Sequence, residues 1–383
     1  MIYNGIESEL SRTFWRSCAA VLVLCCFLQN KSSAGSLGEG NMLGLPPAGG
    51  SFITGRLNLD SFAEGDMFSS PLAHDSFLQK LTVNDSTYDP IYDVVPPQQF
   101  NWAGCPRVTM YGSDPYVFTH VKPIPALVTG GVYFGVLTWL HFYQKRTFWS
   151  STASFRAVNN PNYALDANYG GHFTAGYFLS YLSTESLVES GFGLEMSTIL
   201  GTIMGESYQY YVEIMDGYGA DWGFSAYKIT ANTLGAAMYL ASYYSPFLQN
   251  FNPKADYFPA PWYGDKPRNP SQTPIDDYSA WTFWMSVNVH NLLPESAQNS
   301  WPSWLNIAIG NAARNLGYPD QQRVNVIGLD FNLARILPEG GSTWNWIRQS
   351  LAFIMIPGPA FEIKSHAKPQ GYVFYPFNPH FTL

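Results

Sequence analysis

The chain has 383 residues, of which 13% are charged and 16% are aromatic, and its formal net charge at pH 7 is −8. An average soluble domain has about 25% charged residues, so we expect much of the surface to face something other than water. No basic run occurs, which excludes the positive footprint by which proteins bind nucleic acid. The composition therefore favours a membrane lipid or an envelope protein as partner, and no nucleic acid.

The first 34 residues are typical of a targeting segment. Arg12 and Arg16 precede an apolar run from Cys18 to Leu28, and Ser32-Ser33-Ala34 follows as a small-residue cleavage site. We therefore predict a signal peptide over residues 1–34, with an uncleaved N-terminal anchor as the alternative.

One cysteine, Cys105, lies outside this segment, because the others are Cys18, Cys25 and Cys26. The exported chain would then have no intramolecular disulfide and no cysteine-rich zinc site. Lipidation is not favoured, because Leu24 stands directly before Cys25, where a bacterial lipoprotein has a small residue.

Residues 35–122 are rich in Gly, Pro, Ser and Asp without a sustained helical period, which predicts an irregular arm. Residues 124–143 then run without a charge between Lys122 and Lys145, about the length that crosses a bilayer. A buried helix in a helical core is the alternative reading, because the same length satisfies both.

Three further helices are predicted at 171–187, 194–215 and 225–244, which completes a helical core over residues 123–250. Gly201 and Gly205 have the small-xxx-small spacing that lets another backbone approach closely.

Residues 251–383 form a separate aromatic, Pro-rich C-terminal region. Short helices are expected there near 280–293, 303–316 and 344–354, with a strand at 324–329. The predicted fold class is mainly α: a helical bundle with about four central helices, an irregular N-terminal arm and the C-terminal region.

Polar residues form a regular stripe in the second of these helices. Glu206, Gln209, Glu213 and Asp216 step by three, four and three residues, so on a helix they share one face. Carboxylates held this close in a bundle repel one another unless they are protonated, paired or bound to a metal. We predict that the stripe is buried or lines a cavity, and the alternative is that it faces water. No metal is assigned to it.

Residues of the flanking helices are expected near this stripe. Ser225 suits the N-cap of the third helix, and Lys228 stands where a capping box would have an acid. We expect the charge of Lys228 to meet Glu213, Asp216 or Asp221. His172 begins the first helix and approaches the stripe if the helices pack antiparallel, which would make it a candidate ligand or acid/base group.

These residues resemble a family signature. His172-Phe173, Glu213-Ile-Met-Asp216-Gly217, Gly223-Phe-Ser225 and Asn232-Thr-Leu-Gly235 look like that of the YfiM-like predicted periplasmic lipoproteins, a family without established function. A more distant similarity is to VanZ-like membrane proteins, associated with glycopeptide (teicoplanin) resistance. The resemblance reaches from about residue 166 to 363. It implies an exported protein, periplasmic or outer-membrane-associated in a Gram-negative bacterium, with the inner membrane as the alternative.

Two positions depart from the family pattern. The family usually has an Asp-Lys pair shortly before the histidine, where this chain has Asn168-Tyr169, and an aspartate at the position of Lys228. A family activity that needs the full set of acids would therefore be altered or lost here.

The leading functional hypothesis is a non-enzymatic envelope protein, embedded in or resting on a membrane, that binds a lipid headgroup, a peptide or a protein partner. One alternative is a metal-assisted hydrolase or transferase acting on a lipid-linked envelope substrate, although no nucleophile elbow, phosphate loop or zinc motif occurs. Another is an accessory subunit of a membrane complex, in which the arm wraps a partner. No cofactor is expected. The predicted polar site comprises His172, Glu206, Gln209, Glu213, Asp216, Ser225, Lys228 and Asn232.

Overall fold

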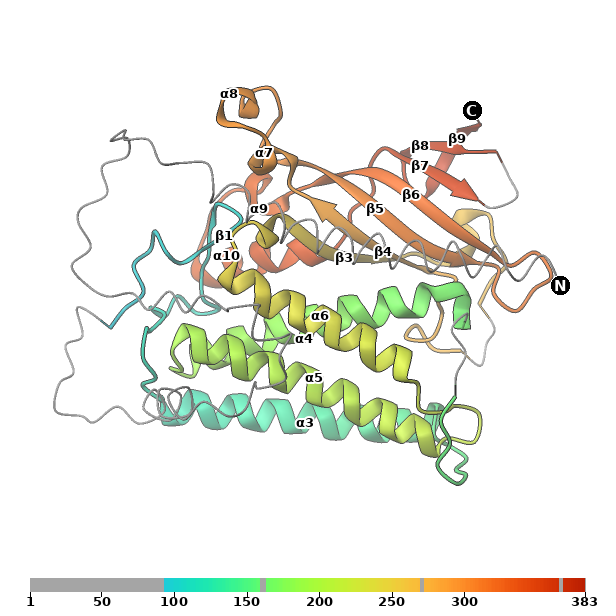
Figure 1. The fold of residues 1–383 in the computed structure, drawn as a ribbon, viewed down its shortest axis with the longest axis horizontal. Coiled ribbons are helices and arrows are strands. Elements are labelled where there is room, and N and C mark those ends of the chain that lie inside the picture. The colour runs from blue at the N-terminus through green and yellow to red at the C-terminus, as the bar shows by residue number, and fades with distance from the viewer. Residues whose placement is uncertain (1–92, 159–162, 269–271, 365–367, 383) are drawn as a thin grey trace, which may run out of the picture. The chain divides into compact units, whose positions relative to one another are not determined.

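The computed structural model describes residues 93–158, 163–268, 272–364 and 368–382 (Figure 1). All of them belong to one compact unit, Thr82–Leu383. The predicted signal peptide and residues 35–92 of the predicted arm lie outside the described residues.

Four long helices occupy the first half of the described chain: α3 (Pro123–Thr147), α4 (Ala167–Glu189), α5 (Leu194–Tyr218) and α6 (Ala226–Tyr244). Each coincides with a helix predicted from the sequence, so these four predictions are confirmed. Helix α4 lies between α5 and the sheet described next, and α6 packs against α4 and α5 (Figure 1).

The predicted fold class is wrong, because the second half of the chain is a sheet. Seven antiparallel strands lie side by side in chain order. They are β3 (Phe251–Tyr257), β4 (Trp281–Val287), β5 (Leu305–Arg314), β6 (Gln322–Phe331), β7 (Ala360–Lys364), β8 (Gln370–Phe374) and β9 (Phe377–Thr382). The protein is therefore a mixed α/β fold, and a helical bundle describes only part of it.

The helix predicted at 303–316 is strand β5, and the helix predicted at 280–293 is strand β4 followed by the short helix α7 (Val289–Leu292). In β4 every second residue is buried, the period-two pattern of a strand with two unlike faces. Its sequence, Trp-Thr-Phe-Trp-Met-Ser-Val, consists mainly of aromatic and β-branched residues, which favour strands. The predicted strand at 324–329 is confirmed within β6, and the helix predicted at 344–354 is α10 with a following 3-10 turn.

Short elements connect these layers. A two-stranded hairpin is formed by β1 (Asn101–Trp102) and β2 (Cys105–Pro106). The short helices are α7 (Val289–Leu292), α8 (Glu295–Gln298), α9 (Leu333–Ile336) and α10 (Ser342–Ser350). The 3-10 turns are η3 (Tyr163–Asp166), η4 (Leu248–Asn250), η5 (Ala260–Tyr263) and η6 (Leu351–Phe353).

Glycines let α4 approach its two neighbouring helices closely. A Cβ atom at Gly201 of α5 would lie 2.5 Å from the backbone nitrogen of Thr184, and one at Gly205 would lie 2.7 Å from that of Ser180. The close approach predicted from the Gly201–Gly205 spacing is therefore confirmed, and the partner is α4. On α6, a Cβ atom at Gly235 would lie 2.0 Å from the carbonyl oxygen of Phe173.

The two faces of the sheet differ in chemistry. The core on one face contains Trp284, Ala308 and Val326. On the other face Ile309 pairs directly with Met285 and with Ile327, and Ile327 pairs with Phe361. Ile309, Ile327 and Phe361 are exposed. The outer face of β5 to β7 thus presents a row of apolar side chains that are about half exposed.

The glycine contacts predict that Gly235→Ala destabilises the fold. The methyl group would push α6 away from the backbone of α4, and overpacking of this kind costs about 1–3 kcal/mol. The free energy of unfolding, measured by urea denaturation followed by circular dichroism, should fall accordingly. Gly131→Ala is the matched control, because nothing lies within 4 Å of a Cβ atom at that position of α3. Equal losses in the two variants would contradict the proposed close packing.

Candidate functional site

The predicted polar stripe on α5 is mostly buried. Glu213 is fully buried, and Gln209 and Asp216 are each 7% exposed, so the prediction of burial is confirmed at these positions. Glu206 is half-buried. It accepts a hydrogen bond from Thr233 Oγ1 of α6 at 2.7 Å. Glu206 lies about two helical turns before Glu213 on α5, so it is separate from the other two carboxylates.

The two buried carboxylates share one ammonium group. Lys228 Nζ lies 3.2 Å from Glu213 Oε1 and 3.1 Å from Asp216 Oδ2. The prediction that Lys228 meets these acids is therefore confirmed. Ser225 caps α6 as predicted, because its Oγ accepts from Lys228 N at 3.5 Å. The backbone nitrogen of Ser225 in turn donates to Glu213 Oε2 at 3.2 Å.

Helix α4 supplies the histidine to the same place. His172 Nε2 lies 3.8 Å from Glu213 Oε1, and His172 Nδ1 lies 3.1 Å from Asn232 Oδ1 of α6. Three helices thus converge, and we call His172, Glu213, Asp216, Lys228 and Asn232 the buried polar cluster.

One member of this site was missed by sequence reasoning. Trp149, which follows α3, donates from its indole Nε1 to Asp216 Oδ1 at 2.8 Å and is itself buried. No motif marks Trp149, because it stands 67 residues before its partner.

Burial shifts the protonation of the cluster. It raises the pKa of Glu213 to about 7, although Lys228 acts in the opposite direction. Burial, together with the charge of Lys228, lowers the pKa of His172 to about 3, so the imidazole is neutral. Burial also disfavours the ammonium of Lys228, but Asp216 and Glu213 more than offset this and keep its pKa above the ordinary value.

This arrangement suits a structural cluster better than a catalytic one. A histidine with so low a pKa is a poor proton donor near neutral pH, and Lys228 already forms ion pairs with both carboxylates. Within the described residues, no group of three or more His, Cys, Asp or Glu side chains is placed to hold a metal ion. The geometry therefore offers the metal-assisted alternative no ligand set.

A buried amide lies beside the cluster. Asn168 is fully buried one turn before His172, and neither polar atom of its side chain has a hydrogen-bond partner. Asn232 Nδ2 also lacks one. Buried polar atoms without a hydrogen-bond partner cost free energy. This part of the helical core therefore contains more polar atoms than the hydrogen bonds around them satisfy.

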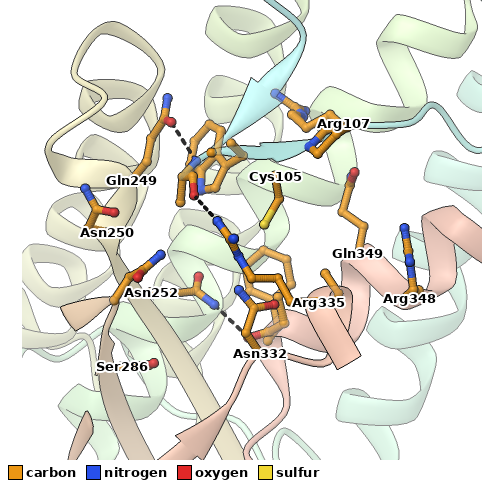
Figure 2. Close-up of a pocket in the computed structure, with 18 of the residues that line it drawn as sticks. Cys105, Arg107, Gln249, Asn250, Asn252, Ser286, Asn332, Arg335, Arg348 and Gln349 are labelled. Atoms are coloured by element: carbon orange, nitrogen blue, oxygen red, sulfur yellow. Dashed lines mark hydrogen bonds between the residues drawn. The ribbon is translucent and has the colours of Figure 1, made fainter. Parts of the chain in front are cut away.

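A polar cavity that the sequence did not predict lies at the hairpin β1–β2 (Figure 2). It has a volume of about 200 Å³ and is bounded by the hairpin, by one end of the sheet and by α9 and α10. We call it the amide pocket, because many carboxamides line it: Gln249, Asn250, Asn252, Asn288, Asn306, Asn332, Asn345 and Gln349. Several of these asparagines stand next to the ends of strands, and this recurrence could have indicated the pocket. It did not, because asparagine is also common in ordinary turns.

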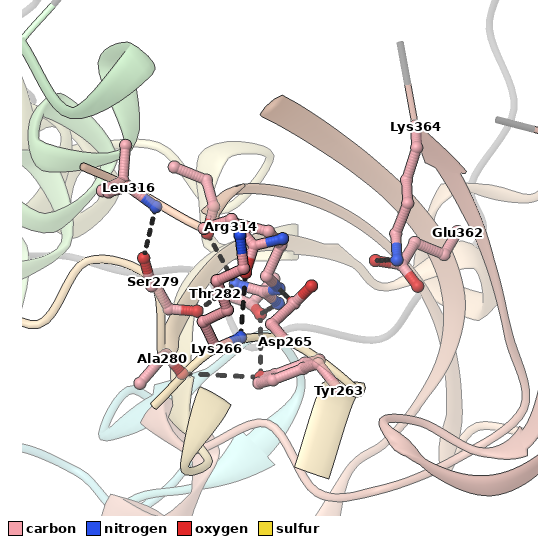
Figure 3. A network of polar contacts seen from close by, with 12 residues as sticks. Tyr263, Asp265, Lys266, Ser279, Ala280, Thr282, Arg314, Leu316, Glu362 and Lys364 are labelled. Carbon is pink, nitrogen blue, oxygen red and sulfur yellow. Dashed lines mark hydrogen bonds and ion pairs between the residues drawn. The ribbon is translucent and has the colours of Figure 1, made fainter. Parts of the chain in front are cut away.

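Another polar network surrounds Arg314 (Figure 3). The Arg314 side chain is fully buried, and its guanidinium lies 3.7 Å from the centre of the Tyr263 ring. It donates to the carbonyl oxygen of Ser279 at 3.0 Å and to Tyr375 OH at 2.9 Å. The network ties the loop after β3 to the sheet and the C-terminal segment, and we assign it to stability.

Helix α3 borders an apolar cavity of about 610 Å³ on the side of α4 and α5. Val132 and Leu140 of α3, Leu182 of α4 and Met204 of α5 are among its lining residues. We call this cavity the α3 groove. Lys122, directly before α3, also lines it.

Comparison with known proteins gave no match: no family model, no curated protein and no solved structure matches this chain. The resemblance to YfiM-like and VanZ-like proteins therefore stays a prediction.

The cluster predicts an unusual dependence of stability on pH. The pKa of Glu213 is about 7 in the fold against an ordinary value of 4.5, so the folded state binds this proton more tightly than the unfolded chain does. The wild type should therefore lose stability relative to Glu213→Gln as the pH rises from about 4.5 to about 7. The expected loss is on the order of 2–3 kcal/mol, because one pK unit corresponds to about 1.4 kcal/mol.

Urea unfolding of both proteins at about pH 5 and about pH 8 measures this difference. The exposed Glu295→Gln variant controls for the removal of one negative charge. A difference between wild type and Glu213→Gln that stays constant over this range would show that Glu213 ionises in the fold as it does in water.

Proposed function

We propose that the protein is a non-catalytic envelope protein that is held at a membrane by helix α3 and binds lipid there. The observation that carries the proposal is the exposure of this helix. Ile124, Leu127 and Phe134 are 76%, 78% and 68% exposed. None of the most apolar 18-residue window of α3 is buried.

The exposure of α3 favours lipid over the alternative of a buried core helix. Core helices are apolar because other protein segments cover them, whereas the described residues cover α3 on one side only, through contacts such as that of Tyr133 OH with the carbonyl oxygen of Met204 at 2.9 Å. Removing one large apolar side chain from water is favourable by about 1.5–3 kcal/mol. A row of them on an uncovered helix therefore favours transfer to a hydrocarbon environment.

The ends of α3 carry the charges expected of a membrane helix. Lys122 precedes it, and Lys145 and Arg146 lie in its last turn. Between them the helix has no charged residue. Cations that flank about 20 apolar residues can reach the headgroup regions on either side of the hydrocarbon core.

The α3 groove supports lipid as the bound molecule. Its volume lies within the range of about 300–1,000 Å³ that is usual for small-molecule sites, and its lining is mostly apolar. An acyl chain fits this chemistry, and Lys122 at the N-terminal end of the groove would face an anionic headgroup. The lipid site is thus proposed at α3 and not at the buried polar cluster, whose carboxylates Lys228 already pairs.

Flotation with vesicles tests the proposal. The full chain, purified in detergent and diluted into phosphatidylcholine–phosphatidylglycerol vesicles, should float with them. The double variant Leu127→Glu/Phe134→Glu should remain in the dense fraction, because it places two charges on the outward face of α3 without touching the core.

Ile275→Glu is the control, because Ile275 is an exposed apolar residue in a loop far along the chain from α3. The control should float like the wild type. Flotation of the double variant at the wild-type level would overturn the assignment of α3 to the membrane.

A further inference from the structure

The amide pocket has a positive charge that the described residues leave unmatched. Arg335 of α9 lines it and forms no ion pair with any described carboxylate, its guanidinium Nη2 donating to the carbonyl oxygen of Ala103 at 3.3 Å. The other cations that line the pocket are paired: Lys254 lies 2.8 Å from Asp330, Arg107 contacts Glu185, and Arg348 lies 3.5 Å from Glu339. The pocket is therefore electrostatically suited to an anion.

Polar atoms of the pocket also lack hydrogen-bond partners. Arg335 Nε is buried and has none. Asn306 is only 6% exposed, and its Oδ1 has none either, although its Nδ2 donates to Asp330 Oδ2 at 3.2 Å. That carboxylate fixes the orientation of the amide, because only the NH₂ group can donate to it. Two residues that line the pocket thus carry an unpaired donor and an unpaired acceptor, and each costs free energy while it is unpaired.

The hairpin β1–β2 covers the pocket and positions Arg335 (Figure 2). Its turn, Ala103-Gly104, has positive φ angles of 49° and 73°. Ala103 N donates to Gln249 Oε1 at 2.9 Å, and its carbonyl oxygen accepts from Asn291 Nδ2 at 2.7 Å as well as from Arg335. The turn is therefore anchored to both sides of the pocket.

We propose that the amide pocket binds a small hydroxylated oxyanion, a carboxylate or a phosphate ester. The guanidinium of Arg335 receives the anionic group through adjacent N–H donors, a geometry that suits both oxyanions. Asn306 Oδ1 accepts a hydrogen bond from a hydroxyl group of the ligand. A volume of about 200 Å³ exceeds the 150 Å³ or so that holds a benzene-sized molecule, so a compact ligand fits. This site is independent of α3 and of lipid binding.

Binding is tested on the full chain in detergent with three probes: glycerol 3-phosphate, glycerate and neutral glycerol. The first two should raise the thermal unfolding midpoint saturably, and glycerol should not. Cys105 lines the pocket and is partly exposed, so bound ligand should also slow its alkylation by iodoacetamide, read by mass spectrometry of its peptide. A response to one anion alone identifies the anionic group that the pocket prefers.

Variants assign the effect to Arg335. Arg335→Gln should weaken binding at least tenfold, whereas Lys266→Gln, which removes an exposed cation outside the pocket, should leave it unchanged. If Arg335→Gln does not fold, Arg335→Lys keeps the charge but loses the adjacent donors, and it should still weaken binding. The proposal fails if neither anion protects Cys105, if glycerol acts as well as the anions, or if a folded Arg335 variant binds like the wild type.

Discussion

The structure depends on the pairing of charges inside the protein. Burying a carboxylate or an ammonium alone costs several kcal/mol, and a close opposite charge offsets much of that cost. Lys228 therefore allows Glu213 and Asp216 to be buried between helices. At the sheet, Lys254 plays the same part for Asp330. Because so many of its few charges point inward, the protein presents apolar surfaces on α3 and on the outer face of the sheet.

The helical half of the fold could be predicted because its signals are local. The charge-free run before Lys145 identified α3, and the spacing of Gly201 and Gly205 predicted a close neighbour. The sheet was missed because the buried positions of β4 mix polar with apolar residues. In β4, the buried Thr282 and Ser286 alternate with Phe283 and Met285, which are partly buried against the helices. An expectation of an apolar interior therefore failed there, although the period of two was present.

The candidate site could be predicted where local signals mark its residues, such as a helical period, an N-cap or a charge. The spacing of Glu213 and Asp216 placed them on one face, and the charge of Lys228 suggested their partner. In the structure, Lys228 is the counter-ion of both acids. Trp149 and the amide pocket could not be predicted, because their contacts join residues far apart in the chain, such as Ala103 and Arg335.

The proposed lipid contact follows from the exposure of α3, whose apolar residues Ile124, Leu127 and Phe134 are mostly exposed. Lipid photo-crosslinking tests it most directly. Benzoylphenylalanine replaces Phe134, on the outward face of α3, or Val132, in the α3 groove, and Tyr318, an exposed loop residue, serves as control. After irradiation in vesicles, we predict lipid adducts at 134 and 132 and none at 318. Adducts absent from both α3 positions, or equally abundant at 318, would contradict the account.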